Sequence, residues 1–244
     1  TAHSPESEAR ADGQLTVTDN FGAALSIAYH AGENATDIAN RLNSEAQRSY
    51  TEILRSSQPL TRSDSSPATQ NTYIGEIAGV TVKSGDTITL AGTDHNGRAF
   101  QRVLTMTSPE SHTLQSILSA IEKITDSRVS ASVDSDGRIM VQDRVSGASK
   151  LTLSVSSTIE GFDLGSVSPV QKGRNAVSVE AAVDSGGFSL VHKAHGSSGF
   201  FTVAGGSGLG LTGGEYRGID VAGSINGYAG TGNGQSLAAS TEDP

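Results

Sequence analysis

The 244-residue sequence contains no cysteine and no tryptophan, and only 18% of its residues are charged. Without cysteine it has no disulfide, no thiolate metal ligand and no cysteine nucleophile. No apolar run approaches the roughly 18 residues that a membrane-spanning helix needs, and residues 1–6 do not resemble a secretory signal. The net charge is −9 and Lys and Arg form no cluster, which argues against nucleic-acid and membrane partners.

Glycine, by contrast, is abundant, with 29 residues, and 35% of the sequence is hydrophobic. Such a composition is typical of short strands joined by tight turns, with enough apolar residues for one or two ordinary cores. We therefore expect an α+β, β-rich protein with two small domains, each built from a sheet and a helix.

One motif occurs twice. Residues 129–137 (VSASVDSDG) are echoed by residues 179–187 (VEAAVDSGG), and each continues into an alternating strand and a turn of small residues. A repeat of this kind marks a supersecondary module that the chain uses more than once.

The helix and hairpin that precede the motif also occur twice. Residues 14–29 alternate as a hairpin, and a helix follows with Asn34 or Thr36 as cap and with Ile38, Leu42 and Ala46 on one face. Later, strands at 86–90 and 100–106 flank an Asn96-Gly97 turn, and we expect both residues of this turn to have a positive φ. The next helix has Ser111 or Thr113 as cap, and its apolar stripe is spaced for burial: Leu114, Ile117, Leu118, Ile121 and Ile124.

Only the second helix is followed directly by its own copy of the repeated motif. Residues 14–50 contain the hairpin and the helix of the module but not the repeated motif that should follow them. Residues 177–204 contain the repeated motif without a hairpin and helix before it. We therefore predict a discontinuous domain, 1–70 with 171–244, and an inserted domain, 71–170, each a ββα-βββ-like module. The alternative is a row of domains in sequence order.

No motif in the sequence supports an enzyme, a cofactor or a metal site. Residues 208–213 spell G-x-G-x-x-G, but no helical pattern follows to bind a pyrophosphate. The turn at Asp134 and Asp136 lacks the later ligands of a calcium loop, and His192 and His195 have no third metal ligand nearby. We expect turns and structural side chains at all of these positions.

Two further segments carry a family resemblance. Residues 218–227 (GIDVAGSING) and 229–237 (AGTGNGQSL) closely resemble a signature of the hook-associated protein 2 family, the flagellar filament caps. Residues 195–200 (HGSSGF) and the helical segments 35–43 and 113–123 are similar to parts of the flagellin-IN modules found in that family.

The resemblance implies an extracellular bacterial protein that is exported through the flagellar type III apparatus and lies at the flagellum tip. It further implies a non-enzymatic assembly role, with flagellin subunits, hook-associated junction proteins and further copies of itself as partners. The long polymerising helices of the family are not present in this sequence. We therefore expect the chain to be the head region, monomeric by itself, of a protein that forms a ring.

Other functions remain open alternatives: an outer domain of a flagellin or of a junction protein, or an adhesin that binds host mucin or glycan. Because function concentrates on exposed loops, we expect contacts at two hairpin turns at one end of the inserted domain and at two tyrosines near the C-terminus. These candidates are Asp94, His95, Asn96, Asp134, Asp136, Tyr216 and Tyr228.

Overall fold

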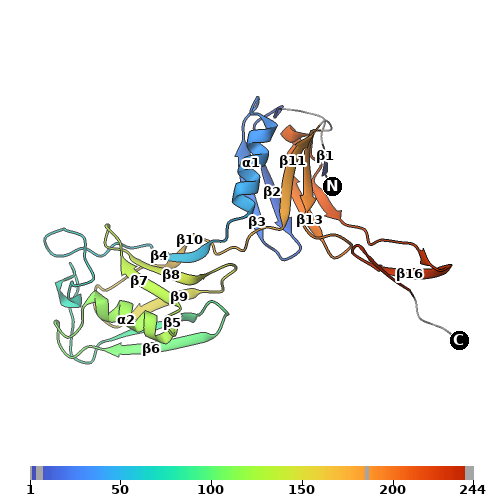
Figure 1. Cartoon of the computed structure of the whole chain (residues 1–244). Helices are drawn as coiled ribbons and strands as arrows, with labels where there is room; N and C mark the ends of the chain where they lie inside the picture. Colours follow the sequence, from blue (N-terminus) through green and yellow to red (C-terminus); the bar gives the residue numbers. More distant parts are fainter. Residues whose placement is uncertain (1, 4–7, 185–186, 240–244) are drawn as a thin grey trace. The chain divides into compact units, whose positions relative to one another are not determined.

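The structure, a computed structural model, describes residues 2–3, 8–184 and 187–239 (Figure 1). The chain divides into two compact units: unit 1 comprises residues 1–48 and 176–244, and unit 2 comprises residues 49–175. The first boundary therefore lies between residues 48 and 49, whereas the sequence analysis placed it at residue 70. The reason is β4 (Thr51–Ser56), which pairs with strands of unit 2 on both of its edges.

Among its described residues, unit 1 contains one long helix, α1 (Ala35–Ala46), two sheets that share a core, and a third sheet near its C-terminal end that is described below. The strands of the first two sheets are β1 (Ala2–His3), β2 (Gly13–Asp19), β3 (Ala24–Tyr29), β11 (Val179–Asp184), β12 (Gly187–His192), β13 (Phe200–Gly205) and β14 (Gly214–Arg217). One sheet has the order β14-β13-β2-β3 and the other the order β1-β12-β11. A single hydrophobic core contains residues from both chain segments, from Ala9 to Ala46 and from Val177 to Leu211.

Sequence periodicity explains the elements of the first segment. In β2 the buried positions alternate with more exposed ones, as expected for a strand with one covered face. Helix α1 begins after Asn34, whose side chain accepts a hydrogen bond from the Thr36 amide at 2.8 Å. Ile38, Leu42 and Ala46 are all buried, so the predicted helix and its apolar face are confirmed.

Unit 2 also contains two sheets and one long helix, α2 (Leu114–Ile124), with a short 3₁₀ turn η1 (Ile74–Glu76). Besides β4, its strands are β5 (Thr87–Thr93), β6 (Ala99–Thr105), β7 (Val129–Val133), β8 (Ile139–Ser146), β9 (Thr152–Ser157) and β10 (Val167–Gln171). The sheet orders are β10-β4-β8-β7 and β6-β5-β9.

Helix α2 presents its predicted stripe to the core of unit 2: Leu114, Ile117, Leu118 and Ile121 are buried, and Ile124 packs at the edge. Thr113 occupies the cap position, but its side chain makes no capping hydrogen bond. The β5–β6 turn differs from the expected pair of positive-φ residues, because only Gly97 has a positive φ, of 88°. The turn instead closes through Asp94, whose backbone amide donates to Arg98 O.

After β14 the chain passes through residues 218–223 into a three-stranded sheet that we call the arm (residues 218–239). Its strands are β15 (Ser224–Ile225), β16 (Tyr228–Asn233) and β17 (Ser236–Ala239). Taken together, the two units and the arm form a β-rich α+β protein with only two long helices among the described residues. Neither helix is long and apolar enough to cross a membrane.

Candidate functional site

The arm is joined to the sheets of unit 1 through Asp220. One carboxylate oxygen accepts the Ser197 amide at 2.9 Å and the Gly234 amide at 2.8 Å, and the other accepts the Ser197 hydroxyl at 2.5 Å. Ser197 lies in the turn before β13, and Gly234 lies in the turn between β16 and β17. The carboxylate therefore ties three distant parts of the chain together, and we call this arrangement the Asp220 clasp.

Hydrogen bonds keep the carboxylate of Asp220 ionised. The hydroxyl of Ser197 has the largest effect, and the amides of Ser197 and Gly234 add to it, so the pKa of Asp220 lies below the ordinary value of 3.8. An anionic acceptor that receives several N–H and O–H donors forms stronger hydrogen bonds than a neutral one.

Two glycines allow the backbones to meet at the clasp. Gly196 has φ of 90°, and a side chain there would collide with Asp220 and with the Gly234 backbone. A side chain at Gly218 would collide with the carbonyl of Gly196. Gly196 lies in the family-like residues 195–200 and Gly218 in the family-like residues 218–227, and close backbone approach explains their residue type.

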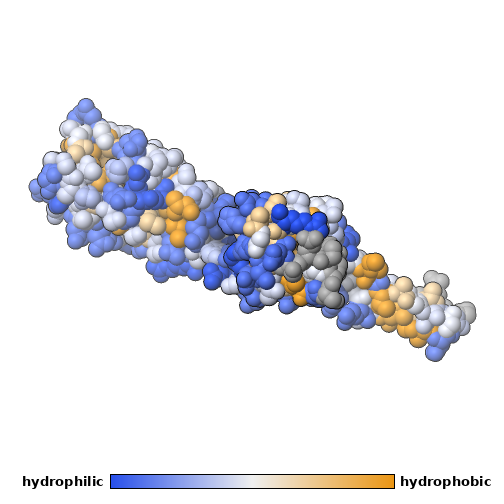
Figure 2. Space-filling view, turned by 90° about the horizontal axis from the view of Figure 1, so that it is seen from above, coloured by the Kyte–Doolittle hydropathy of each residue, from blue (hydrophilic) through white to orange (hydrophobic). Residues whose placement is uncertain are grey.

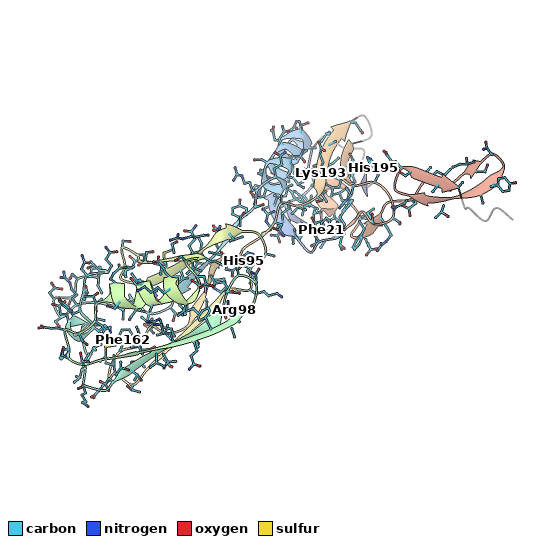
Figure 3. All side chains as sticks on the ribbon, turned by 60° about the horizontal axis from the view of Figure 1, so that its bottom comes forward. Phe21, His95, Arg98, Phe162, Lys193 and His195 are labelled. Atoms are coloured by element: carbon cyan, nitrogen blue, oxygen red, sulfur yellow. The ribbon has the colours of Figure 1, made fainter. Side chains whose placement is uncertain are left out.

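A pocket of about 400 Å³ lies beside the clasp, between the loop after β12 and the root of the arm. Its lining includes His192, His195, Tyr216, Arg217 and Ile219. Figure 3 labels His195 and the neighbouring Lys193 at this root.

Two of the polar groups in this pocket already have partners. His192 is buried, and its ring nitrogens contact the Ala194 amide at 3.0 Å and Asn20 Oδ1 at 2.9 Å. Arg217 lies over the Phe200 ring at 4.2 Å and donates to Glu215 at 2.8 Å. In the part of the chain that the structure describes, no group of three or more His, Cys, Asp or Glu side chains could hold a metal ion. These contacts therefore hold the loop after β12 in place, and we assign no catalytic reaction to the pocket.

The G-x-G-x-x-G segment has a structural explanation as well. It forms the 3₁₀ turn η2 (Ser207–Leu209) and leads into strand β14, so no α-helix starts there to bind a phosphate. The Gly208 amide donates to the Tyr29 hydroxyl at 3.2 Å, and a side chain at Gly208 would collide with the Tyr29 ring.

The arm exposes apolar side chains and carries almost no charge. Ile219 is 89% exposed and Tyr228 is 69% exposed, and Val221 is also exposed. Asp220 is the only charged residue between Gly218 and Ala239, and the clasp uses it. Figure 2 shows the resulting concentration of hydrophobic residues on the arm, at the right of the view.

The structure separates the two turns that the sequence placed at one end of the inserted domain. Asp134 begins the turn before β8, whereas the turn at His95 contacts Asp143, near the other end of the same strand. His95 Nδ1 lies 2.7 Å from the fully buried carboxylate of Asp143, and the His95 side chain is only 16% exposed. His95 is therefore a packing residue, which corrects the expectation of an exposed contact, whereas Asn96 in the same turn is exposed.

The aspartates of these turns also accept hydrogen bonds from residues of the same chain. Asp94 accepts the amides of Asn96 and Arg98 and so closes its own turn. Asp134 accepts the Arg138 amide at 2.9 Å and the Arg55 guanidinium at 2.7 Å. Burial alone would raise the pKa of Asp134, but these donors outweigh it and the pKa is lowered. Asp136 is more exposed, and Arg55 donates to it at 2.8 Å.

The two tyrosines differ. Tyr216 stacks on Phe201 with ring centroids 5.5 Å apart, and its hydroxyl donates to Thr212 O at 2.7 Å. Tyr228 lies in the arm and is exposed. Asp220 and Ser197 lie within family-like segments of the sequence but were not among the predicted site residues. The sequence signal that could have identified Asp220 was a single charged residue in a glycine-rich segment.

No protein-family model matches this chain, and no curated protein matches it. Among solved structures, similarity is found to the D2-D3 domains of the flagellar cap protein FliD from Serratia marcescens, with a TM-score of 0.34, 12% identity, and coverage of 84% of this chain and 100% of that chain. The FliD D2-D3 domains from Escherichia coli give a TM-score of 0.30 and 17% identity, with coverage of 86% of this chain and 76% of that chain. FliD from Helicobacter pylori gives a TM-score of 0.24 and 13% identity, with coverage of 88% of this chain and 78% of that chain. We assign neither fold nor function from similarity at this level.

Proposed function

We propose that this chain is a structural, non-enzymatic part of a bacterial flagellar filament cap, formed by the head domains of a protein of the hook-associated protein 2 family. On this proposal the protein is exported by the flagellar type III apparatus, lies at the flagellum tip and promotes the polymerisation of flagellin. Its partners are flagellin subunits, hook-associated junction proteins and further copies of the parent protein.

One observation carries the proposal: three family-like segments, residues 195–200, 218–227 and 229–237, meet at the Asp220 clasp. The Asp220 carboxylate is occupied by three donors from the same chain, and Gly196 and Gly218 are required for backbone contact. Residues of a family signature that make such contacts within the chain indicate a structural role, since three of the acceptor sites of this carboxylate are occupied by internal donors.

The arm adds support for an assembly role. A three-stranded sheet is stable when one face packs against other protein, and the arm exposes Ile219, Val221 and Tyr228. Apolar surface of this kind is typical of protein interaction sites. Because the arm is nearly uncharged, its burial against another protein subunit carries little cost of removing charges from water.

The geometry of Tyr216 disfavours the alternative function, an adhesin that binds sugars through exposed tyrosines. A sugar-binding platform needs an exposed aromatic face, but Tyr216 uses its ring against Phe201 and its hydroxyl for Thr212. Of these two tyrosines, only Tyr228 retains an exposed ring. We keep binding of host mucin or glycan as the second candidate because of Tyr228.

Immunogold electron microscopy of the source bacterium tests the proposal. Antibodies raised against unit 2 should label the distal tip of each flagellar filament. Label along the whole filament would instead indicate a flagellin, label near the hook would indicate a junction protein, and label on the cell body would indicate an adhesin. A strain with the gene deleted serves as the control for antibody specificity, and its cells should carry no gold. Any of the three other patterns would contradict the cap function.

A further inference from the structure

Three Asn-Gly pairs occur in the chain, at Asn96, Asn226 and Asn233, and each lies at a hairpin turn. Such a pair has an intrinsic reactivity: the glycine amide nitrogen can attack the carbonyl carbon of the preceding asparagine side chain. Glycine has no side chain to obstruct this approach. The reaction requires that the amide leave any hydrogen bond that it makes and that the turn deform.

Two of the three glycine amides are held by hydrogen bonds. The Gly97 amide donates to Asp94 O at 2.9 Å, within the β5–β6 turn. The Gly234 amide donates to the Asp220 carboxylate at 2.8 Å, within the clasp. A hydrogen bond to a carboxylate is the stronger of the two types, so Gly234 is the better protected.

The third pair is free of these constraints. Asn226 and Gly227 form the turn between β15 and β16, with φ of 53° and 84°, and both residues are exposed. The Gly227 amide makes no hydrogen bond to any residue that the structure describes. A Cβ atom placed on Gly227 would meet nothing within 4 Å. Only the two residues of β15 hold one side of this turn in the sheet.

We propose that Asn226 is a site of spontaneous deamidation, and that it reacts faster than Asn96 and Asn233. The Gly227 nitrogen forms a bond to Asn226 Cγ and gives up its proton, and the side-chain nitrogen leaves as ammonia. Water then opens the five-membered succinimide at either carbonyl and yields aspartate or isoaspartate. One water molecule is consumed and one ammonia molecule is released for each asparagine that reacts.

The product alters the arm in two ways. It adds a carboxylate to a segment whose only charge is Asp220, and the isoaspartate form also inserts a methylene group into the main chain between β15 and β16. Both changes lie at the tip of an apolar hairpin, where a charge opposes burial against another protein.

Incubation of the whole chain at mildly alkaline pH and physiological temperature, followed by peptide mapping with mass spectrometry, tests the proposal. Fragment spectra assign the gain of one mass unit to a particular asparagine. We expect Asn226 to convert at least several-fold faster than Asn96 and Asn233 in the same sample. Conversion of either of those two at a rate equal to that of Asn226, or no conversion at Asn226, would overturn the proposal.

Two variants sharpen the test. Asn226→Gln should lose the fast reaction, since glutamine would have to form a less favourable six-membered ring. Asp220→Ala frees the Gly234 amide and should accelerate deamidation of Asn233 while leaving Asn96 unchanged. If Asn233 stays as slow in Asp220→Ala as in the original chain, the hydrogen bond does not provide the protection and the proposed basis of selectivity is wrong.

Discussion

Units 1 and 2 are built from the same module, but only unit 2 receives all of its strands from one continuous segment. In unit 1 the hairpin β2–β3 gains β13 beside β2, and in unit 2 the hairpin β5–β6 gains β9 beside β5. The second hairpin of the module is β11–β12 in one unit and β7–β8 in the other. One topology is thus compatible with a chain that is interrupted by more than a hundred residues.

The helices meet the sheets in matching ways. In unit 1, Asn43 donates to Ala181 O at 2.8 Å and accepts from the Ala181 amide at 2.7 Å. In unit 2, Glu122 accepts the Ala131 amide at 3.1 Å. Asn43 and Glu122 are each the ninth residue of their helix, and the two alanines are equivalent in the repeated motif. Both β11 and β7 are edge strands, so these side chains satisfy backbone groups that would lack a strand partner.

The interruption has an energetic consequence. Where the chain enters and leaves unit 2, Tyr50 and Arg174 exchange backbone hydrogen bonds of 2.8 and 3.0 Å and hold the two strands together. If unit 2 unfolds, its residues become a flexible loop, and closing a loop of this length costs roughly 4 to 5 kcal/mol. Folded unit 2 therefore stabilises unit 1, whereas unit 1 provides no such closure for unit 2.

The largest effect is expected from truncating the matched core residues Ile38 and Ile117, each fully buried and each the fourth residue of its helix. Ile38→Ala and Ile117→Ala should each lower the free energy of unfolding of its own unit by about 2 to 5 kcal/mol, because a cavity remains. Differential scanning calorimetry with deconvolution of the two transitions measures this. Val103→Ala, at an exposed position of β6, is the control and should change neither transition by much.

A smaller effect distinguishes the two helix-to-strand contacts. Asn43→Ala removes a donor and an acceptor from a half-buried strand edge and should cost about 1 to 3 kcal/mol in unit 1. Glu122→Ala removes a single acceptor and should cost about 1 kcal/mol in unit 2. Urea denaturation of each variant compares them. Equal losses, or a larger loss for Glu122→Ala, would show that the two helices are not anchored equivalently.

The smallest effect is local and depends on pH. The folded pKa of Asp220 lies below the value of 3.8 expected when the chain is unfolded, so the clasp contributes its full stability above that value. This contribution is lost as the pH falls from about 3.8 through the folded pKa. The protection factors of the Ser197 and Gly234 amides, measured by NMR and corrected for the intrinsic pH dependence of exchange, should fall over this range, whereas in Asp220→Ala they should be low at every pH. A wild-type profile as flat as that of the variant would contradict the clasp.

Sequence reasoning predicted most of the elements because apolar periodicity and caps act locally. The stripe from Leu114 to Ile124 and the Asn34 cap are examples, and both lie where the pattern placed them. It failed for β4, which has the period of a strand but whose partners are far along the chain, at β8 and β10. Spacing alone cannot reveal which distant strand provides the hydrogen bonds.

The site shows the same limit. The segment that contains Asp220 was noted in the sequence only for its family resemblance, and its partner Ser197 lies more than twenty residues earlier in the chain. The exposure predicted for His95 was wrong because its Asp143 partner belongs to a different hairpin. The apolar arm was visible in the sequence only as a segment with little charge, and its exposure needed coordinates.

The most direct test of the central claim, that folded unit 2 holds the two segments of unit 1 together, is residue-resolved hydrogen exchange on Ile117→Ala and Ile38→Ala. Ile117→Ala should accelerate exchange of core amides in both units, because each opening of unit 2 also removes the loop closure of unit 1. Ile38→Ala should accelerate exchange in unit 1 alone. If Ile117→Ala leaves the amides of β2 and β11 as protected as in the original chain under conditions where unit 2 opens globally, the claim is contradicted.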